Sequence, residues 1–165
     1  MASTYEPIAT STLGTAASTI TFSSIPSTYT DLRIVLAGSV TGNCLILLRF
    51  NNLATTIYST TNLNANGATV GSSRGSNQNS LSFNYSIFIA ASQPFLATAD
   101  VFSYAGSTNK TTLLTSQNDL NGSGAIERNV GLWRDTSAIN RLDIITSANT
   151  LAAGTTATLY GILKA

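Results

Sequence analysis

The chain has 165 residues and a formal net charge of +1, from eight Lys and Arg and seven Asp and Glu residues. Charged residues make up 9% of the chain, against roughly 25% in an ordinary soluble domain, and 21 Ser, 25 Thr and 15 Asn stand in their place. Eight singly scattered bases do not create the field of non-specific nucleic-acid binding, where about 6–10 phosphates are neutralised. No apolar run approaches the roughly 20 residues of a membrane-spanning helix. We therefore expect neither a nucleic-acid partner nor a membrane.

The reactive side chains are equally restricted, because there is one cysteine, Cys44, and no histidine. This excludes an intramolecular disulfide, the usual Cys/His zinc sites and His-dependent catalysis. Cys44 begins an apolar run and is expected to be a buried small hydrophobic residue. The carboxylates stand alone, and several have a basic neighbour, so we interpret them as weak surface ion pairs rather than a catalytic pair. These pairs are Asp31–Arg33, Glu127–Arg128, Arg134–Asp135 and Arg141–Asp143. We expect no catalytic residue, no cofactor and no metal.

Residues 1–17 show no clear hydrophobic period and are rich in Ser, Thr and Ala. We interpret them as an N-terminal arm or lead-in, with a frayed terminus as the alternative. The candidate residues for gripping a neighbouring protein are Tyr5, Pro7, Ile8 and Leu13. Residues 18–165 are expected to form a single domain, at a size where folding buries roughly 70% of the surface of the unfolded chain.

From residue 18 onward, short apolar stretches alternate with Gly, Asn, Ser, Pro and Asp, which is typical of a β-sandwich or barrel. The strands predicted in the first half are 18–22, 32–37, 44–50, a short edge strand at 55–58, and 80–89. The turn 38–43 favours a hairpin that joins 32–37 to 44–50. Both of these runs are nearly continuous in apolar residues, as in strands with little solvent on either face. Residues 62–79 are interpreted as a long surface loop, and 80–89 alternates most cleanly.

The strands predicted in the second half are 98–104, 110–116, 126–133, 142–147 and 155–163. A turn at 106–109 predicts a hairpin, 117–124 is a loop, and 135–140 is the only stretch that could form a helical turn. We expect Phe50 in the core, Tyr29 over the end of a sheet, and Gly161 at a close backbone approach. The fold class is all-β: nine or ten strands in an antiparallel β-sandwich of jelly-roll type.

Three interpretations of the hydroxyl-rich surface remain open. Ice binding requires threonines at a fixed period, which the chain lacks. Sugar recognition could use Trp133 with Arg134 and Asp135, or the loop at 62–79, although Trp133 in the core is the favoured alternative. Low charge and abundant hydroxyls would also suit a surface that adheres to many identical neighbours. Contacts that are repeated on a lattice gain in total strength by avidity.

Several short sequence segments, taken in order along the chain, are similar to those of a known protein family. They lie at residues 5–10, 24–36, 48–51 with 58–59, 137–144 and 154–162. Together they resemble a family of structural proteins encoded by tailed bacteriophages, including phages of cyanobacteria. The resemblance implies a β-rich component on the virion exterior, described variously as head decoration, fibre or tail protein, and it brings no catalytic residue. The short segment between Asn51 and Tyr58 departs from the longer loop expected in the family.

We therefore expect a non-enzymatic capsid decoration or cement protein that bridges neighbouring major capsid subunits. It would assemble in the host cytoplasm, lie on the virion exterior and form a small homo-oligomer, with a trimer favoured. The alternative is a tail-fibre or receptor-binding tip domain that recognises host surface glycan.

Overall fold

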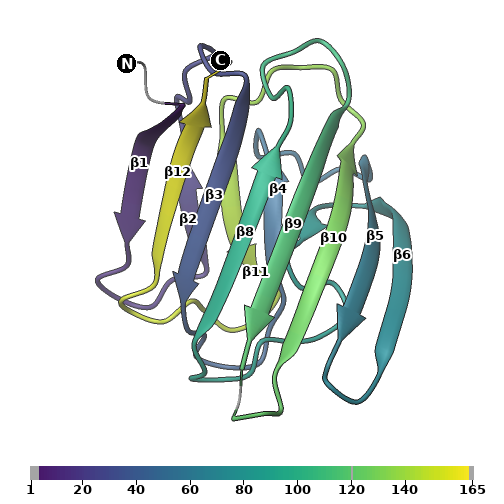
Figure 1. The fold of residues 1–165 in the computed structure, drawn as a ribbon. Helices are drawn as coiled ribbons and strands as arrows, with labels where there is room; N and C mark the ends of the chain where they lie inside the picture. The colour runs from purple at the N-terminus through teal and green to yellow at the C-terminus, as the bar shows by residue number, and fades with distance from the viewer. Residues whose placement is uncertain (1–3, 120, 164–165) are drawn as a thin grey trace.

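The computed structural model describes residues 4–119 and 121–163, and these residues form twelve β-strands and no helix. The strands build two antiparallel sheets that face each other (Figure 1). The large sheet contains, in spatial order, β1 (Tyr5–Thr12), β12 (Thr156–Ile162), β3 (Asp31–Gly38), β8 (Phe95–Val101), β9 (Lys110–Asn118), β10 (Ala125–Trp133), β5 (Tyr58–Ala65) and β6 (Val70–Gln78). The small sheet contains β2 (Thr19–Phe22), β11 (Leu142–Thr146), β4 (Ile46–Phe50) and β7 (Leu81–Ser82). The predicted all-β sandwich is confirmed, whereas the jelly-roll arrangement stays a prediction.

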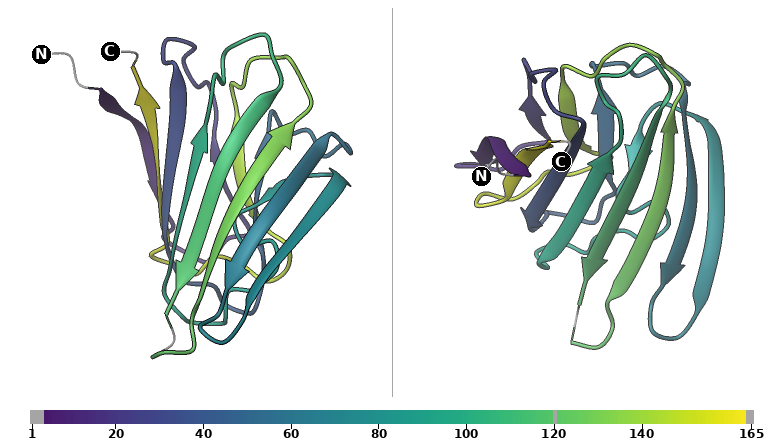
Figure 2. Two further views of the ribbon diagram at one scale, coloured as in Figure 1. Left: turned by 45° about the vertical axis from the view of Figure 1, so that its right-hand side comes forward. Right: turned by 45° about the horizontal axis from the view of Figure 1, so that its top comes forward.

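The turned views show the two sheets facing each other (Figure 2), and the buried apolar side chains that form the core lie between them. Alternate side chains of each strand point into it, because successive residues of a strand face opposite sides of the sheet. In β3, for example, Leu32, Ile34 and Leu36 are fully buried while the residues between them are half-buried. Cys44 is also fully buried, as predicted, and burial raises the pKa of its thiol.

An aromatic cluster closes one end of the core. The ring of Phe50 meets that of Trp133 edge-on at 5.3 Å between centroids, and Tyr58 stacks on Trp133 at 6.5 Å. The Tyr58 hydroxyl donates to the Leu53 carbonyl at 3.0 Å, so this buried ring satisfies its polar end. The predictions of Phe50 in the core and of Trp133 as a core residue are confirmed.

Tyr29 and Gly161 also lie as the sequence predicts. The Tyr29 ring covers Gly161 so closely that a Cβ atom at this glycine would collide with it. The Tyr29 hydroxyl then donates to Glu6 on the neighbouring strand β1 at 3.2 Å. This contact fixes the corner that precedes β3 against the end of the large sheet.

The hairpin predicted between 32–37 and 44–50 is wrong. Strand β3 pairs with β12 and β8 in the large sheet, whereas β4 pairs with β11 and β7 in the small one. The connection through 38–45 therefore crosses from one layer to the other. Hydrophobic pattern identified both strands but carried no information about which strands would pair.

The region 55–79 differs most from its prediction. There is no edge strand at 55–58; Tyr58 instead begins β5, which pairs with β6 in a hairpin. The tip of this hairpin contains Gly67 at φ 83, a conformation that suits glycine. Most side chains of β6 are solvent-exposed, so its Gly- and Ser-rich sequence shows no apolar alternation and resembles a loop.

The long strand predicted at 80–89 is also wrong, since only Leu81–Ser82 forms a strand, β7. The side chain of Asn84, within this stretch, instead binds backbone groups before and after it. Asn84 donates to the carbonyls of Cys44 and Ile87, and it accepts from the Ile46 amide at 2.7 Å. The stretch 135–140, where a helical turn was allowed, contains no helix.

The predicted N-terminal arm at 1–17 contains a strand of eight residues, β1. Strand β1 pairs with β12 from Tyr5 to Thr12 and forms one edge of the large sheet. Ile8 and Leu13 pack against the core. Only residues 1–3 of the predicted arm lie outside the described residues.

Candidate functional site

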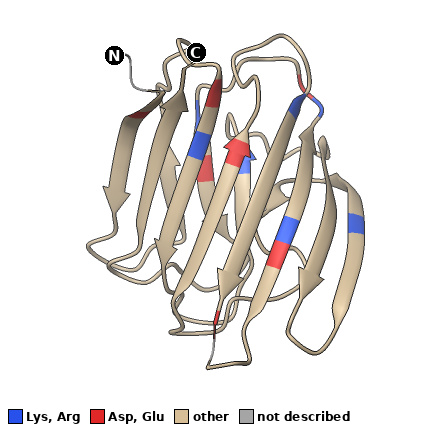
Figure 3. Ribbon diagram, in the orientation of Figure 1, with Lys and Arg blue, Asp and Glu red and all other residues tan. Residues whose placement is uncertain are grey.

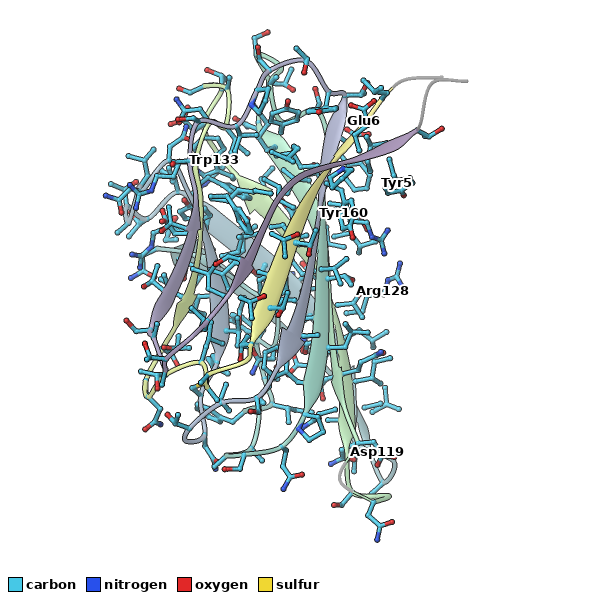
Figure 4. All side chains as sticks on the ribbon, turned by 90° about the vertical axis from the view of Figure 1, so that its left-hand side faces the viewer. Tyr5, Glu6, Asp119, Arg128, Trp133 and Tyr160 are labelled. Atoms are coloured by element: carbon cyan, nitrogen blue, oxygen red, sulfur yellow. The ribbon has the colours of Figure 1, made fainter. Side chains whose placement is uncertain are left out.

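The broadest exposed feature is the side of the large sheet that faces away from the small sheet, which we call the outer face. The strand register lines up its side chains in rows across the sheet. The central row consists of Thr10, Thr158, Val35, Thr98, Thr115, Arg128, Leu63 and Ser72. Hydroxyl, apolar and single charged groups are thus interspersed on one continuous surface, and Figure 4 shows Tyr5, Tyr160 and Arg128 projecting from it.

Apolar side chains are concentrated on the part of the outer face formed by β8, β10, β5 and β6. Val70 is 77% exposed, Leu63 54%, Val130 51% and Ile126 50%. Leu96 is also exposed. Ile126 of β10 lies opposite Ala65 of β5, which in turn lies opposite Val70 of β6, so the three residues form one row across the sheet. Isolated exposed apolar residues are common, but neighbouring ones on one face indicate an interaction surface.

Hydroxyl groups dominate the opposite end of the outer face, on β1 and β12. Thr10 and Thr158 are 3.1 Å apart at their Oγ1 atoms, and Thr12 and Thr156 are 2.9 Å apart. These cross-strand pairs are hydrogen-bonded on the exposed side of the sheet. They offer further donors and acceptors to a partner without adding net charge.

Charges on the outer face are few (Figure 3). Arg33 pairs across the strands with Asp100 at 3.1 Å, so this pair is locally neutral. Arg128 and Arg74 form no ion pair with any described residue. Asp31 lies on the same side of β3 as Arg33, so the two separate guanidinium groups of Arg128 and Arg74 do not amount to a basic patch.

An open pocket of about 700 Å³ indents the lower end of the outer face. Its lining is mainly apolar and includes Pro94, Phe95, Leu96 and Ile126, together with Asp119 from the adjoining loop. No group of three or more His, Cys, Asp or Glu residues lies close enough to hold a metal ion within residues 4–119 and 121–163. Nor does the described part of the chain contain a helix long and apolar enough to cross a membrane.

Glu127 is the most unusual carboxylate in the molecule, because its side chain is buried on the inner side of β10. It accepts backbone N–H groups from Ser86 and Ile87, and the Asn62 amide at 2.6 Å. Burial raises the pKa of Glu127, and these hydrogen bonds counteract part of that rise. The predicted surface pair with Arg128 is wrong, since adjacent strand residues face opposite sides of the sheet.

Glu127 belongs to a buried polar cluster that fastens residues 83–87 to the large sheet. Asn129 donates to the Phe83 carbonyl at 2.8 Å, and Asn62 donates to Asn129 at 2.7 Å. The carboxylate already accepts several donors, and no second acidic group among the described residues belongs to the cluster. The arrangement is suited to anchoring an irregular segment, not to acid–base chemistry.

Lys110 is a buried charge of the opposite sign. Its ammonium group donates to the backbone carbonyls of Gly106, Thr108 and Thr136, and it lies 5.8 Å from the centre of the Trp133 ring. Burial lowers the pKa of Lys110, and the nearby Asp135 carboxylate counteracts this. Lys110 thus ties the β8–β9 connection to the segment after β10.

The predicted sugar-contact residues do not form one exposed platform. Trp133 is fully buried, so its ring is not available to a ligand. Arg134 donates to the Thr56 carbonyl at 2.7 Å and to Asn77 at 2.8 Å. Asp135 accepts the Ser137 amide, a hydrogen bond that lowers the pKa of Asp135. Each of these residues has a local structural contact.

The predicted partner-gripping residues divide between the two sides of β1. Tyr5 is 48% exposed, and Pro7 is also exposed, whereas Ile8 and Leu13 are partly covered by the core. Among the four predicted ion pairs, the structure contains Arg141–Asp143, at 2.8 Å. Sequence reasoning missed the exposed apolar residues of β10, although their position relative to Trp133 could have identified them.

Comparison of the chain with family models, curated proteins and solved structures finds no match in any of the three.

Proposed function

We propose that this chain is a non-enzymatic structural protein on the exterior of a tailed-phage virion, and specifically a capsid decoration or cement protein. It would bridge neighbouring major capsid subunits and hold them together against internal pressure. In this proposal it assembles in the host cytoplasm, folds as a jelly-roll-type sandwich, and acts as a small homo-oligomer, with a trimer expected.

The observation that carries this proposal is the composition of the outer face. Exposed apolar residues such as Ile126 and Val130 lie among threonines and very few charges, on a wide and well-packed sheet. Such a face can adhere to another protein by burying apolar area while its hydroxyls satisfy polar groups at the margin. Many weak contacts of this kind, repeated on a lattice, give a strong total attachment by avidity. The phage-family resemblance of the sequence supplies the proposed setting.

The decisive experiment determines where the protein lies and how many copies a virion contains. We expect labelled protein on the head, in numbers comparable with those of the major capsid protein. A few copies confined to the tail would instead support the receptor-binding alternative. A protein found free in infected cells, with no place in the particle, would refute both.

A second experiment tests the outer face itself. Adding purified protein to heads that lack it should restore binding, and a double variant with Ile126→Glu and Val130→Glu should bind much more weakly. A double variant with Thr19→Glu and Ala148→Glu adds the same two charges at exposed positions in β2 and just after β11, away from the outer face, and is the matched control. Equal loss of binding in both proteins would show that the apolar residues are not the contact.

A further inference from the structure

The two edges of the large sheet expose backbone groups to different degrees. An edge strand has one row of N–H and C=O groups that no neighbouring strand satisfies, and such a row can pair with a strand of another chain. Strand β1 forms one edge of the large sheet and β6 forms the other. In an antiparallel pair, the backbone N–H and C=O groups of alternate residues point toward the partner strand and away from it. One known hydrogen bond between the two strands therefore identifies the residues whose backbone groups point outward.

At the β1 edge, a proline interrupts the outward row. The Leu163 amide donates to the Thr4 carbonyl, so the backbone groups of Thr4 point toward β12. The backbone groups of every second residue after Thr4 also point toward β12, as far as the bulge after Pro7. Pro7 is consequently one of the positions that point outward. Pro7 has no N–H to offer, and the register of β1 shifts between Pro7 and Ala9. Proline and bulges are common means of preventing a sheet from extending.

At the β6 edge, the outward row is intact. The Asn66 amide donates to the Thr69 carbonyl at the hairpin tip, so pairing alternates from there along β6. Val70, Ser72 and Arg74 then direct both their N–H and C=O groups away from β5. These backbone groups form no hydrogen bond with any described residue, and no proline lies in β6.

The outward row of β6 is also complementary to itself. In an antiparallel pair of two β6 strands centred on Ser72, the Val70 position of each copy faces Arg74 of the other. The apolar stem of arginine can cover the valine, which is the most exposed large apolar residue of the described chain. The two Arg74 positions are then about 13 Å apart along the strands. This distance exceeds the Debye length of about 8 Å at physiological salt, so repulsion between the two guanidinium groups is largely screened.

Arg74 also disfavours the neighbouring register. Pairing centred on Arg74 would place the two guanidinium groups directly opposite each other, and like charges in that position destabilise a sheet. We propose that two copies of this chain associate through β6, antiparallel about a two-fold axis at Ser72, and so join their large sheets into one. This contact is independent of the proposed capsid role and differs in symmetry from the trimer expected there.

Sedimentation velocity of the purified chain over a concentration series tests the contact directly. The wild type should form a dimer, and Ser72→Pro should weaken dimerisation by about tenfold or more by removing an outward N–H. Ser72 makes no ladder hydrogen bond to β5 in the derived register, so the fold should remain intact, as circular dichroism can verify. Ser72→Thr keeps the N–H and is the matched control. A wild type that stays monomeric at about 1 mM, or a trimer unaffected by Ser72→Pro, would overturn the proposal.

The register has its own test in charge-swapped variants. Val70→Lys should abolish the dimer, because the introduced lysine faces Arg74 of the second copy. Adding Arg74→Glu to that variant should restore it, since the introduced lysine would then face an opposite charge. Failure of the second change to restore the dimer refutes the proposed register. Head binding should be measured on Ser72→Pro, which leaves the exposed apolar side chains of the outer face unchanged, so that loss of the dimer with head binding retained separates this contact from the capsid role.

Discussion

The two halves of the large sheet have opposite chemistry on their inner sides. In β12 and β3, the inward residues are apolar and fully buried, as with Ile34 and Leu159. In β10 and β5, several inward residues are polar and equally buried, as with Glu127, Asn129 and Asn62. Both halves are strands of one sheet, with the same hydrogen-bond pattern between neighbours.

The difference follows from what covers each half. The small sheet satisfies its own backbone through strand pairing, so it can present purely apolar side chains. The stretch 83–87 is irregular, and its buried N–H and C=O groups require partners from elsewhere. Glu127, Asn129 and Asn62 supply them. The part of the sheet that is covered by this irregular segment therefore carries polar groups inside, and Ile126 and Val130 of β10 face solvent.

The apolar half should show the largest stability effect. Ile34→Ala removes a fully buried side chain and leaves a cavity, so we expect a loss of about 2–5 kcal/mol in the free energy of unfolding. Urea denaturation measures the change. Val35→Ala, on the half-buried outer side of the same strand, should cost much less. Equal losses would contradict the assignment of Ile34 to the core.

In the polar half, Glu127→Gln should cost about 1–3 kcal/mol, because an amide supplies one acceptor oxygen where the carboxylate supplies two. Hydrogen exchange should accelerate at the Ser86 and Ile87 amides in particular. Asp119→Asn, on an exposed loop, is a control that should leave both amides protected. Unchanged exchange in Glu127→Gln would show that the carboxylate does not hold this segment.

The same carboxyl group predicts a pH dependence. Burial raises the pKa of Glu127 above its ordinary value of 4.5, so the folded chain holds this proton more tightly than the unfolded chain. Its contribution to stability is therefore greatest below the unfolded pKa and declines as the pH rises through the folded pKa. Urea midpoints measured across this range should fall with pH, and Glu127→Gln should lessen the fall. If the urea midpoint of the wild type rose with pH relative to that of Glu127→Gln, the raised pKa of Glu127 would be contradicted.

The smallest effect is expected on the solvent side of β10. Ile126→Thr and Val130→Thr replace exposed apolar residues, so each should change the free energy of unfolding by no more than about 0.5 kcal/mol. Thermal denaturation checks this. If either change destabilised the isolated chain strongly, that residue would contribute to the fold instead of a contact surface.

Strand β10 illustrates how far sequence reasoning could reach. Its alternation identified a strand, but apolar Ile126 and Val130 share one face with Arg128, while Glu127 and Asn129 share the other with Trp133. A buried Trp133 fixes which face is inside, so the polar interior could have been inferred from parity alone. The partner of Glu127 could not, because residues 83–87 are about 40 positions away along the chain.

The edge strands β1 and β6 show a second limit of prediction from sequence. Both β1 and β6 have one free edge and largely exposed side chains, so neither shows the apolar period that identifies an interior strand. For that reason the sequence alone predicts an arm and a loop at these two places. Pairing with β12 and β5 makes them strands, and backbone hydrogen bonding depends little on side-chain type.

Local pattern is sufficient to predict the all-β class, most of the interior strands, the buried Cys44 and the aromatic core residues, because burial of one face of a strand imposes a two-residue period. The pairing of the strands, the partner segment of Glu127 and the open edge of the large sheet became known from the tertiary structure alone. These properties depend on contacts between residues far apart in the chain, and local pattern does not encode them.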